Sequence, residues 1–503
     1  MDQRIDSKEA FDFERVTYDL PVPIQFEEFF EKFYGQLARS QPLSDSDTRG
    51  KQSSSPPLFR NPAEPPDGGY GWVCVLCVAV INAHTWGINS SYGVFLAFYL
   101  SNSVYPGATA LEFAFVGGLS ISTCFLVAPL ATLSTHYFGL RPTMLAGTLF
   151  EAGGLIGASF ATEIWQLFLT QGVAFGIGMG FLFVTSIGIP SQWFTTKRSL
   201  ANGVASSGSG FGGLMFSLSS AAMLKSIGIA WCFRVLGLLA LVVNSICIIF
   251  IRDRSKEIGS RYSPFETRLL KRPEYLLLNA YGFFFFFGYI ALIFSLADYA
   301  KKIGLDIAQA SLISALVNMG QGFGRPAVGY FADSIGRINM AALTSSACAL
   351  LVYVVWTMAK NFGVLVFFAI IGGSVIGSFQ SNIGPVAAEV VGLQDLPAAL
   401  SLEWLALVLP CTFSEPIALQ IFGITGNYLG TQIFVGTSYL GAALCMVLLR
   451  GWKVGEQNEI LRIEHSNKVE KKNVGNSSHE ATDAARLAGR RTILTHFAVW
   501  RKV

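Results

Sequence analysis

The sequence predicts an all-α membrane protein with twelve transmembrane helices in two six-helix halves, and three observations predict it. First, 52% of the 503 residues are hydrophobic and 14% are charged, with a mean hydropathy of +0.47, whereas charged residues approach about a quarter of a soluble domain. Second, apolar segments long enough to span a bilayer follow one another along the chain. Third, the longest polar interruption divides these segments into two equal sets.

The apolar segments begin at Gly71 and are separated by short breaks. They cover residues 71–99, 111–133, 142–161, 165–188, 200–222, 231–251, 275–297, 308–331, 340–359, 362–388, 397–422 and 428–450. The long interruption follows the sixth segment, which predicts six helices on either side. The expected organisation is an N-terminal tail over 1–66, a first half over 67–251, a central loop over 252–274, a second half over 275–450 and a C-terminal tail over 451–503.

Both tails are polar, and both are expected in the cytosol. Residues 40–66 are rich in Ser, Asp and Pro, so the N-terminal tail is expected to be partly disordered. The chain turns polar again after Arg450, and its last stretch holds too short an apolar run to span a bilayer. We expect this last stretch, residues 481–503, to be disordered or loosely bound to a surface.

The charges of the loops predict the orientation, because Lys and Arg resist translocation and collect on the cytoplasmic side. With both termini in the cytosol, the inside loops carry Arg141, Lys197, Arg198, Arg252, Arg254, Lys256, Arg261, Arg268, Lys271, Arg272 and Arg337. The outside loops then carry only Lys225, Lys301, Lys302 and Lys360. The sequence therefore predicts a multi-pass protein of the plasma membrane with cytosolic termini.

Several functions are disfavoured by composition. The net charge of +3 is small and dispersed, so nucleic acid is not an expected partner. All eight cysteines fall inside apolar segments, which disfavours a disulfide scaffold or a metal site. No nucleophile, base and orienting group stand at a recognisable spacing, so no catalytic residue is assigned and no enzyme is expected. No cofactor is expected either.

Polar residues interrupt the first apolar segment. Asn82, His84, Asn89, Ser90 and Ser91 would each cost free energy in hydrocarbon unless protein groups satisfy them. This helix is therefore expected to face other helices or a cavity. The stretch from His84 to Ser91 is expected to line a central pathway opposite Arg325, with His84, Asn89, Ser90 and Ser91 as candidates to bind substrate. His84 is a candidate to carry a proton, since imidazole titrates near neutral pH; the alternative is a neutral hydrogen-bonding group.

Arg325 lies well inside the eighth segment, where a guanidinium needs a partner or a watery cavity. Asn318 and Gln321 precede it by seven and four residues, so the three share one face of a helix. We expect this stripe to line a pore and bind substrate. The alternative is a permanent ion pair with Glu403 or Glu415, and Glu415 is itself a second candidate to carry a proton.

The loop after the eighth segment carries a motif. GYFADSIGR, from Gly329 to Arg337, resembles the GxxxDxxGR cytoplasmic loop of the major facilitator superfamily, whose two halves rock about a central site. The resemblance implies that Asp333 and Arg337 belong to a conformational latch. The corresponding loop of the first half, THYFGLRP, keeps Arg141 but lacks the acidic residue, so Arg141 is the weaker latch candidate. Glu151, Glu389 and Glu403 are further candidates to carry a proton. Glu389 and Glu403 lie near predicted cytoplasmic ends and are expected rather at the interface or in the latch.

Two further motifs narrow the resemblance. DGGYGW, from Asp67 to Trp72, and WFTTKRSLANGVASSGSGFGG, from Trp193 to Gly213, resemble the signatures of the monocarboxylate porter family, and particularly of its fungal members. In that family an arginine matching Arg325 binds a substrate carboxylate. Proton-coupled members carry aspartate and lysine where this chain has Gln321 and Ser90. The lactate and proton mechanism of the family is therefore not implied.

The expected function is secondary active transport of a small organic solute, a carboxylate or another anionic metabolite, by alternating access. The expected partners are this solute, a proton and the lipid bilayer, with the chain acting as a monomer. Two alternatives remain open. One is a dedicated efflux transporter of a fungal secondary metabolite, and the other is a membrane sensor that does not transport.

Overall fold

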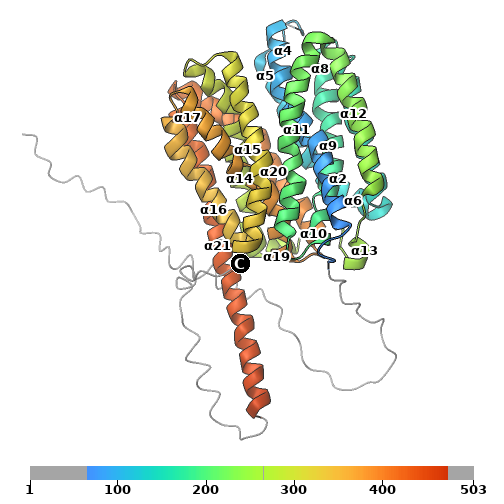
Figure 1. Ribbon diagram of the computed structural model, residues 1–503, viewed down its shortest axis with the longest axis vertical. Helices are drawn as coiled ribbons and strands as arrows, with labels where there is room; N and C mark the ends of the chain where they lie inside the picture. Colours follow the sequence, from blue (N-terminus) through green and yellow to red (C-terminus); the bar gives the residue numbers. More distant parts are fainter. Residues whose placement is uncertain (1–64, 103, 264, 474–503) are drawn as a thin grey trace, which may run out of the picture. The chain divides into compact units, whose positions relative to one another are not determined.

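The computed structural model describes residues 65–102, 104–263 and 265–473, and the regular structure within them is helical (Figure 1). The predictions for residues 1–64 and for the end of the C-terminal tail lie outside the described residues. Figure 1 shows the helices of the first half, coloured blue to green, beside those of the second half, coloured yellow to red.

The first half contains six predicted spans, several of them broken into shorter helices. In order they are α2 (Gly71–His84), α3 (Trp86–Ser90) and α4 (Tyr92–Asn102); α5 (Ala110–Leu126) and α6 (Ala128–Phe138); α7 (Leu140–Ala158); α8 (Ile164–Leu167), η1 (Phe168–Ala174), α9 (Phe175–Ser186) and α10 (Ile189–Trp193); α11 (Arg198–Ser226); and α12 (Gly228–Phe250). Short helices α13 (Ser255–Ile258) and η2 (Leu269–Lys271) lie in the central loop.

The second half contains the other six. They are α14 (Pro273–Lys302); α15 (Ile307–Ile335); α16 (Arg337–Leu350) with η3 (Leu351–Trp356); α17 (Phe362–Phe367), η4 (Phe368–Gly372), α18 (Gly373–Ile376) and α19 (Ser378–Val391); α20 (Leu396–Thr425); and α21 (Leu429–Asn473). Each apolar segment predicted from the sequence thus coincides with one helix or one broken helix.

Eight of these units are long and apolar enough to cross a membrane, and the pair α5 and α6, bent by 43°, makes a ninth. Helices α7, α11 and α15 occupy the three remaining predicted places within the described residues. They are less apolar because α11 and α15 carry Gly, Ser and amide side chains toward neighbouring helices. Such small and polar residues are typical of helix contacts inside membranes.

The first span is broken at Thr85, whose backbone leaves the helical region, and again at Ser91. The Thr85 hydroxyl donates to the Ile81 carbonyl at 2.9 Å, and the Ser91 hydroxyl donates to the Ile88 carbonyl at 2.6 Å. Hydroxyls that bond back to the preceding turn in this way bend helices. The predicted polar interruption therefore marks a distortion of the helix as well as a face of it.

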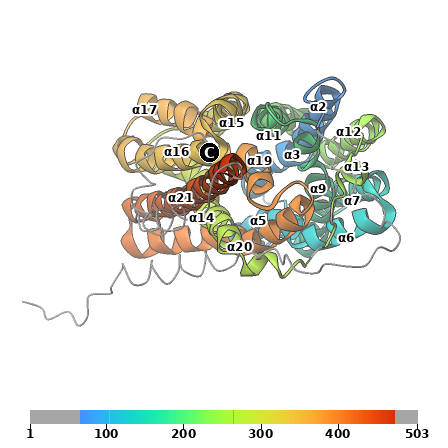
Figure 2. The same ribbon diagram turned by 90° about the horizontal axis from the view of Figure 1, so that it is seen from below.

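Helix α11 lies at the boundary of the halves, between α2 and α15, while α5 meets α20 across the same boundary (Figure 2). Glycines allow the close approach. A Cβ added to Gly208 would lie 1.8 Å from the Ala79 carbonyl oxygen on α2, and one added to Gly203 would lie 2.4 Å from the Arg325 carbonyl oxygen on α15. A larger residue at either position would push two backbones apart.

Helix α21 continues past the predicted membrane end to Asn473 (Figure 1). The last stretch, residues 481–503, which was expected to be disordered or loosely bound to a surface, lies outside the described residues. The extension after Arg450 is polar and rich in Glu, Lys and Arg, which are good helix formers. An ion pair of 2.6 Å between Lys453 and Glu456 adds support within one turn.

Candidate functional site

Arg325 is the central charged residue of the site, and its side chain is 1% exposed. Its Nε donates to the Gly377 carbonyl at 3.2 Å, and its Nη1 donates to the Ser206 carbonyl at 2.7 Å and to the Ser209 hydroxyl. Its Nη2 donates to Gln321 Oε1 at 2.5 Å. All of these acceptors are uncharged, so the guanidinium is solvated by dipoles from both halves of the protein.

No acidic side chain among the described residues forms an ion pair with Arg325. The alternative of a permanent pair with Glu403 or Glu415 is therefore not found in this conformation. Glu415 instead lies near Tyr92 of α4, and Glu403 lies against Gly282 of α14. Arg325 is a buried cation without a countercharge, which is costly unless an anion joins it.

The three members of the predicted stripe on α15 have different neighbours. Gln321 accepts from Arg325 and also from the Tyr289 hydroxyl, at 3.3 Å. Asn318 lies farther along the helix, where a Cβ added to Gly213 would be 3.2 Å from Asn318 Nδ2 and 3.1 Å from Ser90 Cβ. The structure thus brings Ser90 of the first span to Asn318, on the stripe that holds Arg325.

The other residues predicted in the first span contact their own half. His84 Nδ1 lies 2.8 Å from the Val80 carbonyl, and its ring meets the Phe216 ring edge-on at 5.3 Å. Asn89 Nδ2 donates to the Ser120 hydroxyl at 2.6 Å. Ser90 bonds to the Trp86 carbonyl at 2.8 Å, and Ser91 bonds within its own turn as described above. None of these contacts joins His84, Asn89 or Ser91 to Arg325.

A small cavity lies beside Arg325, with a volume of about 10 Å³. It is lined by Phe285, Phe286, Tyr289, Arg325, Ile376, Gly377, Phe379 and Gln380. This space is about enough for one water molecule. Aromatic rings and one guanidinium thus line a small space, which must widen before it can hold an organic solute.

An aromatic cluster connects the two halves near this cavity. Its members are Trp86, Phe125, Phe183, Phe286, Phe379 and Trp404. The Trp404 ring stacks on Phe125 with centroids 5.2 Å apart and meets Phe183 at 4.9 Å. Phe286 meets Phe125 at 5.6 Å. Rings from the first half therefore pack directly on rings from the second half.

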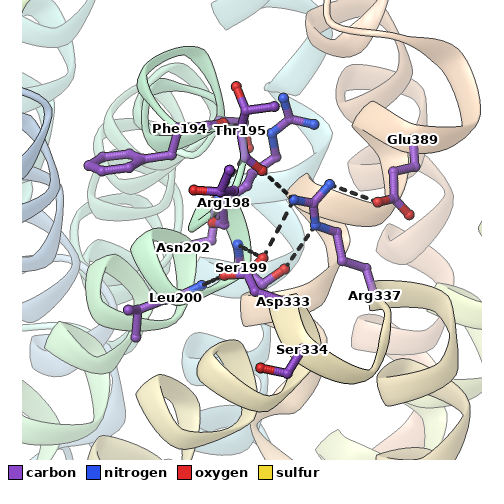
Figure 3. A network of polar contacts seen from close by, with 12 residues as sticks. Phe194, Thr195, Arg198, Ser199, Leu200, Asn202, Asp333, Ser334, Arg337 and Glu389 are labelled. Atoms are coloured by element: carbon purple, nitrogen blue, oxygen red, sulfur yellow. Dashed lines mark hydrogen bonds and ion pairs between the residues drawn. The ribbon is translucent and has the colours of Figure 1, made fainter. Parts of the chain in front are cut away.

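Asp333 holds the beginning of α11 (Figure 3). Its carboxylate accepts from the backbone N–H groups of Ser199 at 3.0 Å and Leu200 at 2.9 Å. These are free N–H groups of the first helical turn, where the helix dipole also favours negative charge. A side chain of the second half thus caps a helix of the first half.

Arg337 forms the second part of this contact, as Figure 3 shows. Its Nη2 donates to the Thr195 carbonyl at 2.6 Å, its Nε donates to the Ser199 hydroxyl at 3.2 Å, and its Nη1 binds Glu389 Oε1 at 2.7 Å. Asp333 lies at 3.5 Å from the same guanidinium. We call Asp333, Arg337, Glu389 and the turn Thr195–Leu200 the interdomain latch. It joins the halves at the predicted cytoplasmic end.

The DGGYGW motif supports the turn that the latch grips. Asp67 Oδ1 accepts from the Thr195 N–H at 2.9 Å and from the Thr196 N–H at 3.1 Å, and Oδ2 accepts from the Thr196 hydroxyl. Slight burial raises the pKa of the Asp67 carboxyl, but these hydrogen bonds together outweigh it and place the pKa below its ordinary value. The two sequence motifs of the first half therefore meet at one turn.

Arg141, the third latch candidate, lies elsewhere. Its Nη2 donates to the carbonyls of Ile249 at 3.0 Å and Ile251 at 3.2 Å, at the end of α12. Both partners belong to the first half. The loop with the degenerate motif therefore bonds within its own half, whereas its counterpart reaches across the boundary.

Sequence reasoning did not identify several residues that surround Arg325. Ser206 and Ser209 supply acceptors from α11, and Gly377 supplies one from the broken span of α18 and α19. Trp404 fills the boundary between the halves. The three-residue spacing of the two serines within the small-residue run of α11 was the available signal, since it places both on one face.

Two bundles of six helices with a polar centre between them define a membrane transporter that works by alternating access. The chain belongs to the Major Facilitator Superfamily, whose family model matches residues 75–402. The fold predicted from the sequence is thereby confirmed.

Three relatives place the chain more closely. "Probable transporter MCH2" of Saccharomyces cerevisiae is 32% identical, over 80% of this chain and 87% of that protein. "Fujikurins efflux protein" of Gibberella fujikuroi is 28% identical, over 76% of this chain and 83% of the relative. "Monocarboxylate transporter 10" of Rattus norvegicus is 27% identical, over 83% of this chain and 86% of the relative. The predicted resemblance to monocarboxylate porters and their fungal relatives is confirmed.

A solved structure has the same fold. The proton:xylose symporter XylE aligns with a TM-score of 0.61 at 13% identity, covering 76% of this chain and 94% of the symporter. The chain is therefore a multi-pass membrane transporter, and its family and relatives are transporters rather than enzymes.

Proposed function

We propose that this chain transports a small organic anion by alternating access and that Arg325 binds the carboxylate of that anion. One observation carries the proposal. Arg325 is fully buried between the halves, yet all its hydrogen-bond acceptors are uncharged. A carboxylate that replaced the carbonyl and hydroxyl acceptors would add charge-assisted hydrogen bonds worth about 1.5–3 kcal/mol each.

The remaining polar groups near the stripe suit a solute larger than a bare carboxylate. Asn318, Gln321 and Ser90 offer neutral donors and acceptors, and we propose that they bind the solute's other polar groups. Phe286 and Phe379 supply apolar surface beside the cavity. His84, Asn89 and Ser91 are proposed to line the pathway when the halves separate, although none of the contacts described above joins them to Arg325.

The interdomain latch supports a proposal about the conformation. Because the latch and the aromatic cluster close the predicted cytoplasmic end, we propose that this conformation is closed toward the cytosol. Asp333 and Arg337 would release their first-half partners when that end opens. Arg141 would not take part, since its partners belong to one half.

The test replaces Arg325 and measures transport. Full-length Arg325→Gln and Arg325→Lys should both reach the membrane, and both should lose at least about tenfold of their uptake or efflux, because lysine restores the charge without the two-pronged geometry. The probe is a panel of radiolabelled small carboxylates supplied to cells that overproduce the chain. Arg234→Gln is the matched control, since Arg234 also lies in a span but bonds to Ser159 away from the site. Unchanged transport by Arg325→Gln would remove Arg325 from the binding site.

A separate comparison of strains tests the direction of transport. The efflux relative favours export of a fungal metabolite as the alternative to uptake. Comparing metabolites inside and outside a deletion strain with those of an overproducing strain decides between the two. A chain that moves no solute in either comparison would instead support the sensor alternative.

We further propose a monomer in the plasma membrane with both termini in the cytosol. Single cysteines test the orientation, because the native cysteines are buried among the described residues. A maleimide that cannot cross membranes should label Lys360→Cys from outside intact cells and should label Lys271→Cys only after permeabilisation. The reverse pattern would invert the topology.

A further inference from the structure

Glu403 of α20 is a carboxyl in an unusual place. Its side chain is 1% exposed, and neither carboxylate oxygen has a hydrogen-bond partner among the described residues. The sequence makes Glu403 one candidate to carry a proton but favours a place at the interface or in the latch; in the structure the side chain lies against the second half. A Cβ added to Gly282 of α14 would lie 2.0 Å from Glu403 Oε1, so the carboxyl lies against bare backbone.

Among the described residues, no charged group compensates Glu403. The ionisable side chains near it are the tyrosines Tyr275 and Tyr281, both from α14. The helices α5, α6, α19 and α21 also pack on α20, and within the described residues they bring no Lys, Arg, His, Asp or Glu to this carboxyl. An ionised carboxylate here would lose its hydration without gaining a hydrogen bond or an ion pair. A protonated carboxyl avoids most of that free-energy cost.

Glu403 also lies between two cavities. Leu400, one turn earlier on α20, lines a cavity of about 40 Å³ between the halves at the predicted cytoplasmic end. Phe285 and Phe286, one turn beyond Gly282 on α14, line the cavity beside Arg325. Trp404, the next residue of α20, belongs to the aromatic cluster that closes the boundary. Separation of the halves at this end would therefore bring water close to Glu403.

We propose that Glu403 is a proton-binding site that couples protonation to closure of the predicted cytoplasmic end. When this end closes, the carboxylate takes one proton from cytoplasmic water and is buried as the neutral acid. When it opens, the acid returns the proton to water and is hydrated as a carboxylate. The proposal rests on alternating access, but it requires neither Arg325 nor a particular solute.

Linkage gives the expected size of the effect. If one proton is taken up on closing, the ratio of open to closed molecules rises about tenfold per pH unit above the ordinary carboxyl range. Glu403→Gln is neutral at every pH, so it should remain closed and lose this dependence. Glu151→Gln is the matched control, because Glu151 is equally buried but is held by Asn244 within the first half and moves with that half.

Spin labels at Lys197 and Gln394 measure the opening. Both are exposed, and they belong to different halves at the latch end. Distances between the labels are measured from pH 5 to pH 9 on the full chain in lipid nanodiscs without solute. A pH-dependent shift that disappears in Glu403→Gln and persists in Glu151→Gln supports the proposal. The same slope in Glu403→Gln, or its loss in Glu151→Gln, overturns it.

A second measurement needs no substitution. Dicyclohexylcarbodiimide reacts with protonated carboxyls in apolar surroundings, and peptide mass spectrometry locates the product. Glu403 should be labelled near neutral pH and labelled less as the pH rises; absence of label at pH 6 would overturn the proposal. Because neither measurement uses a solute, a failure of the Arg325 assignment leaves both results interpretable.

Discussion

The two halves contribute different chemistry to their boundary. The second half supplies charged side chains, namely Arg325, Asp333 and Arg337. The first half contributes mostly backbone N–H groups, carbonyls and hydroxyls of α11 and of the turn before it, together with one buried charged side chain, Arg198, which lies within electrostatic range of Asp333, Glu389 and Arg337. Substitution cannot remove backbone groups, so most side-chain changes that weaken the boundary fall in the second half. The contribution of the first half is changed most by substitutions that alter how closely its helices pack.

The two equivalent loops show the same difference. Arg337 reaches across the boundary to Thr195, whereas Arg141 bonds to Ile249 and Ile251 of its own half. The loop after the second span lacks the acidic residue of the motif, which in the second half caps α11. Among the described residues, the polar loop contact that crosses the boundary is therefore formed by the second-half motif and not by its first-half counterpart.

The largest expected effect on the open to closed ratio comes from a substitution that forces α11 and α15 apart. Gly203→Val should prevent α11 from packing on α15, because even a Cβ would meet the Arg325 carbonyl at 2.4 Å. Overpacking of this kind costs about 3 kcal/mol, or roughly a hundredfold in the open to closed ratio. The spin-label distance should shift to the open value at neutral pH. Gly188→Ala is the control, since nothing lies within 4 Å of its added Cβ.

Asp333→Asn should give the next largest effect. The amide keeps the shape but offers one neutral acceptor where the carboxylate accepts from Ser199 and Leu200. Loss of charge-assisted hydrogen bonds costs about 2 kcal/mol and should favour the open state roughly thirtyfold. Ser334→Asn, at an exposed neighbouring position, should leave the distance distribution unchanged. An unchanged distribution for Asp333→Asn would argue that the latch does not hold this end.

Arg337→Lys should act more weakly. Lysine keeps the charge near Glu389 but cannot bind Thr195 and Glu389 at once with separate guanidinium nitrogens. We expect about 1 kcal/mol, or about fivefold in the same ratio. A shift as large as that of Asp333→Asn would show that Arg337, and not the helix cap, is the main contact.

The smallest effect is expected at Asp67, which supports the first half without crossing the boundary. Asp67→Asn should lower thermal stability by about 1 kcal/mol, as for loss of a helix-type cap. The folded pKa of Asp67 is lowered, so its stabilisation is present above the ordinary carboxyl pKa and is lost as pH falls through the lowered value. The difference between wild type and Asp67→Asn should therefore be equal at pH 7 and pH 6, and a difference that vanished at pH 6 would contradict this assignment.

The sequence predicted the twelve helices and the latch motif because both are local: apolar length marks a span, and a loop motif marks its end. It also placed Asn318, Gln321 and Arg325 on one face through helical periodicity. It could not predict that Ser206 and Gly377 would bind Arg325, since that depends on how closely distant helices approach. Which way the Glu403 side chain points depends on how α20 is rotated about its own axis. Because α20 is apolar on all sides, no periodic pattern in its sequence predicts that rotation.

The most direct test of the account compares two ligands at Arg325. It measures the affinity of the wild-type chain for the carboxylate that proves active in the panel and for the neutral amide of the same compound. A buried arginine without a countercharge should prefer the carboxylate by at least about tenfold. Arg325→Gln should lose this preference while Arg234→Gln keeps it. Equal affinity of the wild-type chain for both compounds would contradict the claim that Arg325 binds the anion.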